Sequence, residues 1–303
     1  MAAAIEADDP RGAFSALQEV FDDERRAIGA ARTNQTARFD ALATADALRV
    51  VVRLIPMDEP ATANEDPLRD LLARAGEVAA QALFTQLSAA PTAGERRAVF
   101  DVIVAVGVRS KRFVTSLHHP QWYVVRNAAA LLGALRVTEA TETLVQTLRH
   151  PDGRVSIAIV DALGSLGTAL APQALLLTLS DATSEVRHAA LHALVRLAVH
   201  MPPSALVAAL DREDRPEVQL DLASAMHACT EKETHQALVR FCARTLAHGG
   251  SVAAALSALE VLARHRPTSL ATFLKHLEDH DDACVRAHVE RLRELALQSH
   301  VAA

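Results

Sequence analysis

The apolar positions of the chain recur in blocks of about thirty residues, which is the signature of a repeat architecture. Six blocks start at a valine that follows a polar turn, and these valines are Val125, Val155, Val186, Val218, Val252 and Val285. Their successive spacings are 30, 31, 32, 34 and 33 residues. From each valine, apolar residues return at i+4 and at i+7 or i+8, which places them on one face of an α-helix. The spacing has room for two short helices and two turns.

Each block also repeats the order of helix, polar turn and helix. A first helix with an apolar stripe is predicted over residues 143–148 and again over 174–179. Polar turns follow at 150–153, 180–183 and 279–282, where Asp and Ser are suited to cap the next helix. The second helix often ends near glycine, as in residues 162–167. Upstream, residues 76–87 and 94–106 predict a further pair. The chain is therefore predicted to be all-α, with paired antiparallel helices.

The turn and second helix resemble the HEAT repeat family, especially its short bacterial form, which reads Asp-Pro-x-x-x-Val-Arg-x-x-Ala-Ala-x-Ala-Leu-Gly. The best matches are residues 119–133, 151–167 and 181–197. The resemblance implies a right-handed α-α superhelix, a HEAT-type solenoid of about seven to eight helical repeats. It also implies that the arginine after the valine pairs with a turn aspartate of a neighbouring repeat. Ser156, Gln219 and Ala253 take this position in three units, so that ladder is expected to be interrupted.

The domain prediction has two parts. Residues 1–39 form an acidic N-terminal capping segment, in which Phe14 to Ile28 is amphipathic with Phe14, Leu17 and Phe21 on one face. Residues 40–303 form the solenoid, which matches the repeat loosely over 40–75 and well over 76–298. Residues 56–66 contain two prolines and four acidic residues, which predicts an exposed loop.

The charge distribution argues against a nucleic-acid partner. The net charge is −6, and residues 1–66 carry all of it, with 13 Asp/Glu against 7 Lys/Arg. Residues 67–303 hold 24 of each sign. A surface that binds phosphate backbones needs a net positive field, which this balance does not supply globally. We therefore expect no nucleic-acid partner.

The chain also lacks signals for export or membrane insertion. Its N-terminus has no basic start followed by an apolar run. Residues 162–180 carry no charge, but they contain Gly164, Gly167 and Pro172 and predict a helix end, a turn and a new helix. Cys229, Cys242 and Cys284 form no CxxC pair, which is typical of reduced thiols used as small core residues. The sequence predicts a cytoplasmic protein with no membrane span.

No residue pattern indicates catalysis or a bound metal. HEAT-like di-iron hydroxylases use His-Glu pairs, and none of the 14 histidines here is followed by Glu. His188 and His192 share a helix face, but two imidazoles without a third ligand predict solvated side chains. No phosphate loop and no GxSxG motif occurs. We expect no catalytic residue, no metal and no cofactor.

The segment from His118 to Asn127 contains the only Trp and the only Tyr, beside an Arg. Trp122, Tyr123 and Arg126 are residue types that dominate protein interfaces. The competing interpretation is that Trp122 and Tyr123 cover the turn and fill a gap between adjacent repeats.

The sequence thus predicts a non-catalytic protein–protein interaction scaffold whose second helices line an extended concave face. The candidate partner-binding residues are Trp122, Tyr123, Arg126, Asn127, Asp161, His188 and His192, of which Asn127, Asp161, His188 and His192 are predicted from the register to be exposed on that face. The alternative is an enzyme or enzyme subunit on a HEAT-like fold, similar to a phycobilin lyase subunit or a DNA glycosylase. Polar side chains that converge in one pocket would favour the enzyme, and polar side chains spread along the face would favour the scaffold.

Overall fold

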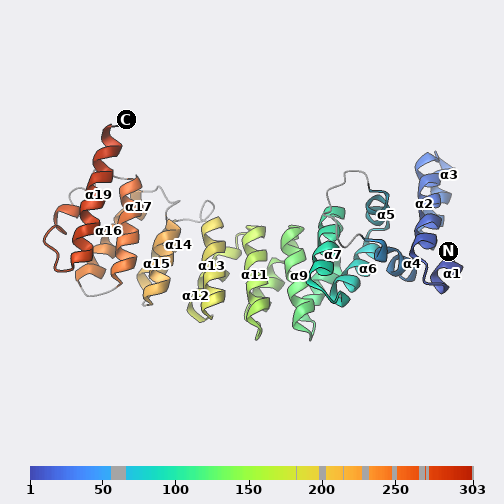
Figure 1. Ribbon diagram of the computed structural model, residues 1–303, viewed down its shortest axis with the longest axis horizontal. Coiled ribbons are helices and arrows are strands. Elements are labelled where there is room, and N and C mark those ends of the chain that lie inside the picture. Colours follow the sequence, from blue (N-terminus) through green and yellow to red (C-terminus); the bar gives the residue numbers. More distant parts are fainter. Residues whose placement is uncertain are drawn as a thin grey trace. The chain divides into compact units, whose positions relative to one another are not determined.

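The computed structural model describes residues 1–55, 66–181, 183–197, 203–213, 215–226, 232–247, 251–265, 270 and 273–301. All regular elements within these ranges are helical, so the predicted all-α fold is confirmed (Figure 1). The chain divides into two compact units, Met1–Leu166 and Gly167–Ala303. Of the loop predicted at 56–66, residues 56–65 lie outside the described residues.

The first unit begins with four helices and continues as helix pairs. Its elements are α1 (Ala2–Glu6), α2 (Pro10–Arg26), α3 (Ala30–Leu42), α4 (Ala45–Val51), the 3-10 turn η1 (Val52–Leu54), α5 (Pro67–Ala75), α6 (Glu77–Ala89), α7 (Ala93–Val106), α8 (Lys111–Thr115), η2 (Ser116–His118), α9 (Trp122–Ala134), η3 (Thr138–Ala140), α10 (Thr141–Thr147) and α11 (Gly153–Leu166). The predicted pair at 76–87 and 94–106 is confirmed as α6 and α7.

The second unit repeats the pairing. Its described helices are α12 (Ala171–Asp181), α13 (Ser184–Leu197), α14 (Pro203–Arg212), α15 (Pro216–Ala225), α16 (Lys232–Ala247), α17 (Val252–His265) and α19 (Ala283–Val301). The uncharged stretch 162–180 is the end of α11, a turn and most of α12, as predicted. No helix among the described residues combines the length and the apolar character that a membrane span requires.

The predicted repeat matches the observed second helices. They begin at residues 122, 153, 184, 216, 252 and 283, at or just before the six valines. Five of these valines are buried, and Val252, in the weakest match, is partly exposed. The valine recurs in the sequence because the same position of each second helix packs into the core.

The turns between paired helices are closed by side chains that accept backbone N–H groups. The Oδ1 atom of Asp152 accepts the N–H of Arg154 at 2.9 Å, and Asp282 does the same for Cys284 at 2.7 Å. These bonds confirm the predicted role of turn aspartates as helix caps.

A histidine also closes three of the turns. Its Nδ1 atom accepts the N–H of the residue two positions later, which directly precedes the second helix. The pairs are His119 with Gln121 at 3.1 Å, His150 with Asp152 at 3.0 Å and His280 with Asp282 at 3.1 Å.

Helices α9 and α11 approach each other closely at Gly133. A Cβ atom built on Gly133 would lie 2.7 Å from the Cα atom of Ala162, which no real side chain tolerates without a shift. A glycine is therefore required at position 133 because the two helices approach so closely, and not because the backbone there has an unusual angle. The close approach aligns α9 and α11 as neighbouring second helices (Figure 1).

The amphipathic helix predicted over Phe14 to Ile28 is observed as part of α2, but its predicted C-terminal end is wrong. Leu17 and Phe21 are buried on α2, and Phe14 is partly exposed. The helix stops at Arg26, and Ile28 lies outside it with 88% of its side chain exposed. Helix α3 buries only Phe39 of its own residues, so polar contacts must contribute to holding it.

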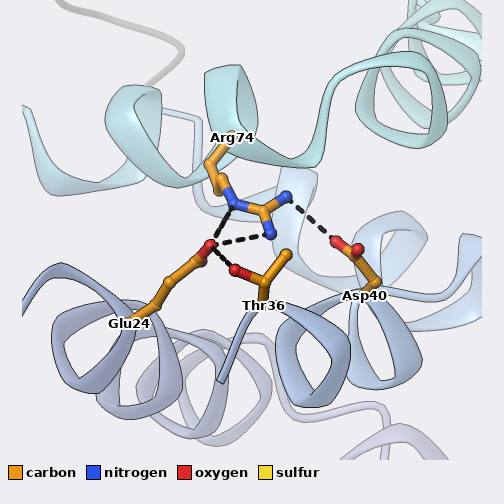
Figure 2. A network of polar contacts seen from close by, with 4 residues as sticks. All are labelled: Glu24, Thr36, Asp40 and Arg74. Carbon is orange, nitrogen blue, oxygen red and sulfur yellow. Dashed lines mark hydrogen bonds and ion pairs between the residues drawn. The ribbon is translucent and has the colours of Figure 1, made fainter. Parts of the chain in front are cut away.

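Figure 2 shows the polar network that joins α2, α3 and α5. The carboxylate of Glu24, a residue that is 7% exposed, accepts hydrogen bonds from Nε and Nη2 of Arg74 at 2.9 and 3.0 Å. The Thr36 hydroxyl donates to Glu24 at 2.7 Å, and Nη1 of Arg74 donates to Asp40 at 3.0 Å. The Arg74 guanidinium also lies 4.6 Å from the centre of the Phe39 ring.

This network sets the ionisation of Glu24. Burial alone would raise the pKa of its carboxyl group, but the hydrogen bonds from Arg74 and Thr36 favour the ionised form more strongly. The pKa of Glu24 therefore lies below its ordinary value. The local sequence pattern does not indicate this cluster, because Glu24 and Arg74 are 50 residues apart in the chain.

Candidate functional site

The second helices of the first unit expose one side chain per turn on a common face. We call this the α9–α11 face. On α9 and α11 it consists of Trp122, Tyr123, Arg126, Ala130, Ala134, Arg154, Ile157, Asp161 and Ser165, all exposed or half-buried. Apart from the adjacent Trp122 and Tyr123, the residues follow one another at steps of three or four, which keeps them on one side of each helix. Val125 and Val155 lie on the buried sides of these helices.

Trp122 connects two consecutive repeats. It is half-buried at the first position of α9, and the Tyr123 ring stands at 90° to it with 5.9 Å between ring centres. The guanidinium carbon of Arg154, in the first turn of α11, lies 3.5 Å from the centre of the Trp122 ring. This is a cation–π contact between neighbouring repeats. Trp122 thus contacts the next repeat and also keeps part of its surface in solvent.

Arg154 is fixed by a second contact. Its Nε atom donates to Oδ1 of Asp152 at 3.0 Å, and its Nη2 atom donates to Oδ2 at 2.7 Å. These bonds lower the pKa of Asp152 to about 2. The side chain of Arg154 is nevertheless 61% exposed. Arg154 is not among the residues predicted from the sequence. The signal that could have indicated it is the Asp-x-Arg pattern at the turn one repeat after the tryptophan.

Arg126 differs from the expectation that the resemblance implied. It is exposed on α9, and within the described part of the chain it forms no ion pair with a turn aspartate. Arg154 pairs with the turn aspartate instead. At the equivalent position of the last repeat, Arg286 donates to the carbonyl oxygens of His280 and Asp281 and not to a carboxylate.

Asn127 is not on the exposed face. It was predicted to be exposed, but it is only 8% exposed, because it lies on the side of α9 that packs inward. Its Nδ2 atom is buried without a hydrogen-bond partner in the structure. Asp161, by contrast, is exposed on α11 as predicted.

His188 and His192 lie in the second unit, on α13, and both are exposed one turn apart. In the described ranges, no group of three or more His, Cys, Asp or Glu side chains is arranged to hold a metal ion. His276 and His280 do not share a helix, since residues 276–279 form a turn.

The cysteine prediction is correct for one residue and wrong for another. Cys242 is buried, its thiol donates to the carbonyl of Ala255 at 3.4 Å, and burial raises its pKa. Cys284 is exposed in the first turn of α19. Cys229 lies outside the described residues.

A polar cluster also joins second helices in the second unit. Arg291 of α19 forms an ion pair with Glu260 of α17, and Nε2 of His288 lies 3.5 Å from the same carboxylate. Burial lowers the pKa of His288, and the nearby Arg291 charge adds to the effect. This cluster connects neighbouring repeats, as Trp122 and Arg154 do in the first unit.

Comparison with known proteins agrees with the repeat. Residues 110–195 match the family model for HEAT repeats. None of the curated proteins is similar enough to match. Among solved structures, an engineered protein is 18% identical with a TM-score of 0.40, and the alignment covers 98% of this chain and 92% of that one. Importin beta is 13% identical with a TM-score of 0.48, covering 94% of this chain and 44% of that one.

The complex of CpcE and CpcF, the phycocyanin lyase of Nostoc sp. PCC7120, is 19% identical with a TM-score of 0.32, covering 78% and 91% of the two chains. The paired helices of residues 110–195 are HEAT repeats.

Proposed function

We propose that the protein is a non-catalytic protein–protein interaction scaffold and that the α9–α11 face is its binding surface in the first unit. One observation carries this proposal. The polar side chains of the face are spread along it: Arg126 lies in the first turns of α9, and Asp161 lies beyond the middle of α11. Active sites gather such groups in a concave pocket, whereas repeat proteins bind partners over extended faces.

The groups with shifted pKa values support the same proposal. Among the described residues they are Glu24, Arg74, Asp152, Arg154, Cys242 and His288. Catalytic sites bring such groups together in one cleft. Here they lie apart from one another: Glu24 is paired with Arg74, Asp152 is paired with Arg154, and Cys242 and His288 are shifted mainly by burial at two other places.

The proposal is tested by capturing partners from an extract of the source cells with the purified full-length chain. A double charge reversal, Arg126→Glu with Asp161→Arg, changes the face without changing the net charge. The matched control is Glu142→Arg, which reverses an exposed charge on α10, outside the face. Circular dichroism establishes that each variant is folded.

We expect a defined set of proteins to be retained by the wild type and by Glu142→Arg, and to be lost from the double variant. Capture that is equally strong with the double variant contradicts the proposed surface. Saturable turnover of a small molecule by the purified chain contradicts the non-catalytic assignment.

A further inference from the structure

We infer that the α9–α11 face binds an acidic peptide segment of a protein partner, and that Arg126 and Arg154, on either side of the Trp122 edge, hold its carboxylates. The inference rests on the proposed function, because it assigns a partner chemistry to the proposed surface. It is carried by three observations: the local charge, the state of the two arginines and the direction of the two helices.

The charge of the chain changes sign at this part of the first unit. Residues 1–101 hold 11 Lys/Arg against 17 Asp/Glu, a net charge of −6. Residues 102–166, which include α8 to α11, hold 7 Lys/Arg against 4 Asp/Glu, a net charge of +3. Residues 167–303 return to −3, with 13 Lys/Arg and 16 Asp/Glu. Two of the seven cations of residues 102–166, Arg126 and Arg154, lie on the α9–α11 face, and exposed cations at an interface favour partners of negative charge.

Arg126 is also available for binding. Upstream in the first unit, arginines are paired with carboxylates, as Arg53 is with Asp8, Arg74 with Glu24 and Arg97 with Asp101. Arg126 is exposed and forms no ion pair in the described part of the chain. An exposed guanidinium without a carboxylate keeps all of its donors for a partner.

Arg154 is fixed in place before any partner arrives. Two of its nitrogens are bound to Asp152 and its plane lies on the Trp122 ring, while its Nη1 atom makes no hydrogen bond among the described residues. Its side-chain freedom has therefore already been lost in the free protein, which reduces the entropic cost of binding. Nη1 remains available to a carboxylate of the partner.

The positions of these residues place two cations at one edge of the face, one of them against an aromatic ring. Arg126 is four residues after Trp122 on α9, hence on the same side of that helix, and Arg154 reaches Trp122 from α11. Trp122 is the first residue of α9 and Arg154 is the second of α11, so the positive ends of both helix dipoles lie at the same edge. Arginine, tryptophan and tyrosine at one edge form the kind of anchor found at interface hot spots.

A peptide carboxylate fits this edge better than a phosphate backbone. Two cations match one or two carboxylates, whereas duplex binding depends on many phosphate contacts over an extended positive field. Asp161 lies on the same face beyond this edge and interrupts such an extended field. The charge pattern therefore favours a short acidic segment.

Trp122 is the only tryptophan, so its fluorescence reports directly on this edge. The probe is a 12-residue peptide made of three Glu-Leu-Asp-Gly units, titrated into the full-length chain at low salt. The control peptide replaces Glu and Asp by Gln and Asn. We expect a saturable change in emission with the acidic peptide only, and about tenfold weaker binding when salt rises to physiological strength.

Two matched variants locate the site. Arg126→Glu is expected to weaken peptide binding at least about tenfold, as hot-spot changes do. Lys111→Glu makes the same charge change at an exposed residue at the start of α8, outside the α9–α11 face, and is expected to weaken binding less than about twofold, because salt screens exposed charges that do not contact the peptide. Circular dichroism checks that both variants remain folded.

The absence of a saturable change with the acidic peptide overturns the inference, as does an equal effect of Arg126→Glu and Lys111→Glu. Tighter binding of a 12-nucleotide thymidine oligomer than of the acidic peptide also overturns it, in favour of a nucleic-acid ligand. The two proposals fail separately. If captured partners depend on Arg126 and Asp161 while the acidic peptide does not bind, the scaffold proposal stands and only the acidic partner is wrong.

Discussion

At the residue scale, Asp152 combines two roles at the start of α11. Its Oδ1 atom caps the helix by accepting the N–H of Arg154, and its carboxylate also holds the Arg154 guanidinium on Trp122. The pKa of Asp152 is lowered from 3.8 to about 2. The stabilising effect of the pair is therefore complete above pH 3.8 and is lost as the pH falls through about 2.

The two roles of Asp152 are separated by two substitutions. Asp152→Asn keeps a cap acceptor but removes the charge, so we expect a nearly unchanged melting temperature and a Trp122 that acrylamide quenches more strongly. Asp152→Ala removes both roles and lowers the melting temperature as well. Quenching that stays at the wild-type level in both variants would show that the ion pair does not hold Arg154 on the ring.

Glu24 offers a residue-scale test of the N-terminal network. Glu24→Gln leaves the Arg74 charge without its main partner and is expected to lower the free energy of unfolding by about 1–3 kcal/mol at pH 7. Because the pKa of Glu24 is lowered in the folded state, its contribution to stability is complete above the ordinary value of 4.5 and is lost as the pH falls below it.

The difference between wild type and Glu24→Gln should therefore shrink on acidification, in urea unfolding followed by circular dichroism at pH 7 and pH 4. Asp40→Asn is the control, because Asp40 is exposed and contacts only one nitrogen of Arg74. A stability difference that does not depend on pH would contradict the assigned ionisation of Glu24.

At the element scale, the spacing between α9 and α11 depends on one missing side chain. Gly133→Ala places a methyl group 2.7 Å from the Ala162 backbone, so the two helices must separate. Overpacking of this kind is expected to lower the free energy of unfolding by about 1–3 kcal/mol.

Gly94→Ala is the matched control for that change. Gly94 lies in α7, and a Cβ atom there would meet nothing within 4 Å. Alanine in place of an unhindered helical glycine is expected to raise the free energy of unfolding by up to about 1 kcal/mol. Equal effects of the two substitutions, measured by urea unfolding, would show that helix propensity and not helix spacing governs Gly133.

At the scale of the whole molecule, the chain is a repeat array that forms two compact units, Met1–Leu166 and Gly167–Ala303. Each repeat packs mainly against its neighbours, so stability is expected to be the sum of local terms and not a single cooperative quantity. A strong perturbation in one unit should therefore stay within that unit.

Hydrogen exchange measures this locality. Gly133→Leu separates α9 from α11 more strongly than alanine does, and we expect faster amide exchange in peptides of residues 110–166. Exchange in peptides of residues 203–301 should remain close to wild type. Acceleration of similar size in both regions would indicate that the chain unfolds as one cooperative body.

The sequence by itself determined the features that depend on local chemistry. The recurrence of a valine, the turn aspartates and the helical period placed the second helices, and their observed starts agree with the six valines. Helix periodicity and capping act within a few residues along the chain, so one sequence contains the information needed to predict them. The uncharged stretch at 162–180 was interpreted correctly for the same reason.

The tertiary structure alone decided which side chains meet across repeats. The sequence did not predict that Arg154 covers Trp122, that Arg74 pairs with Glu24, or that Gly133 allows α9 to approach α11. It also placed Asn127 on the wrong side of α9 and Cys284 in the core. These outcomes depend on how each helix is rotated and set against its neighbour, and one residue along a helix turns the exposed direction by about 100°. Local patterns fix where a helix starts and stops, but packing between helices fixes what each of its residues touches.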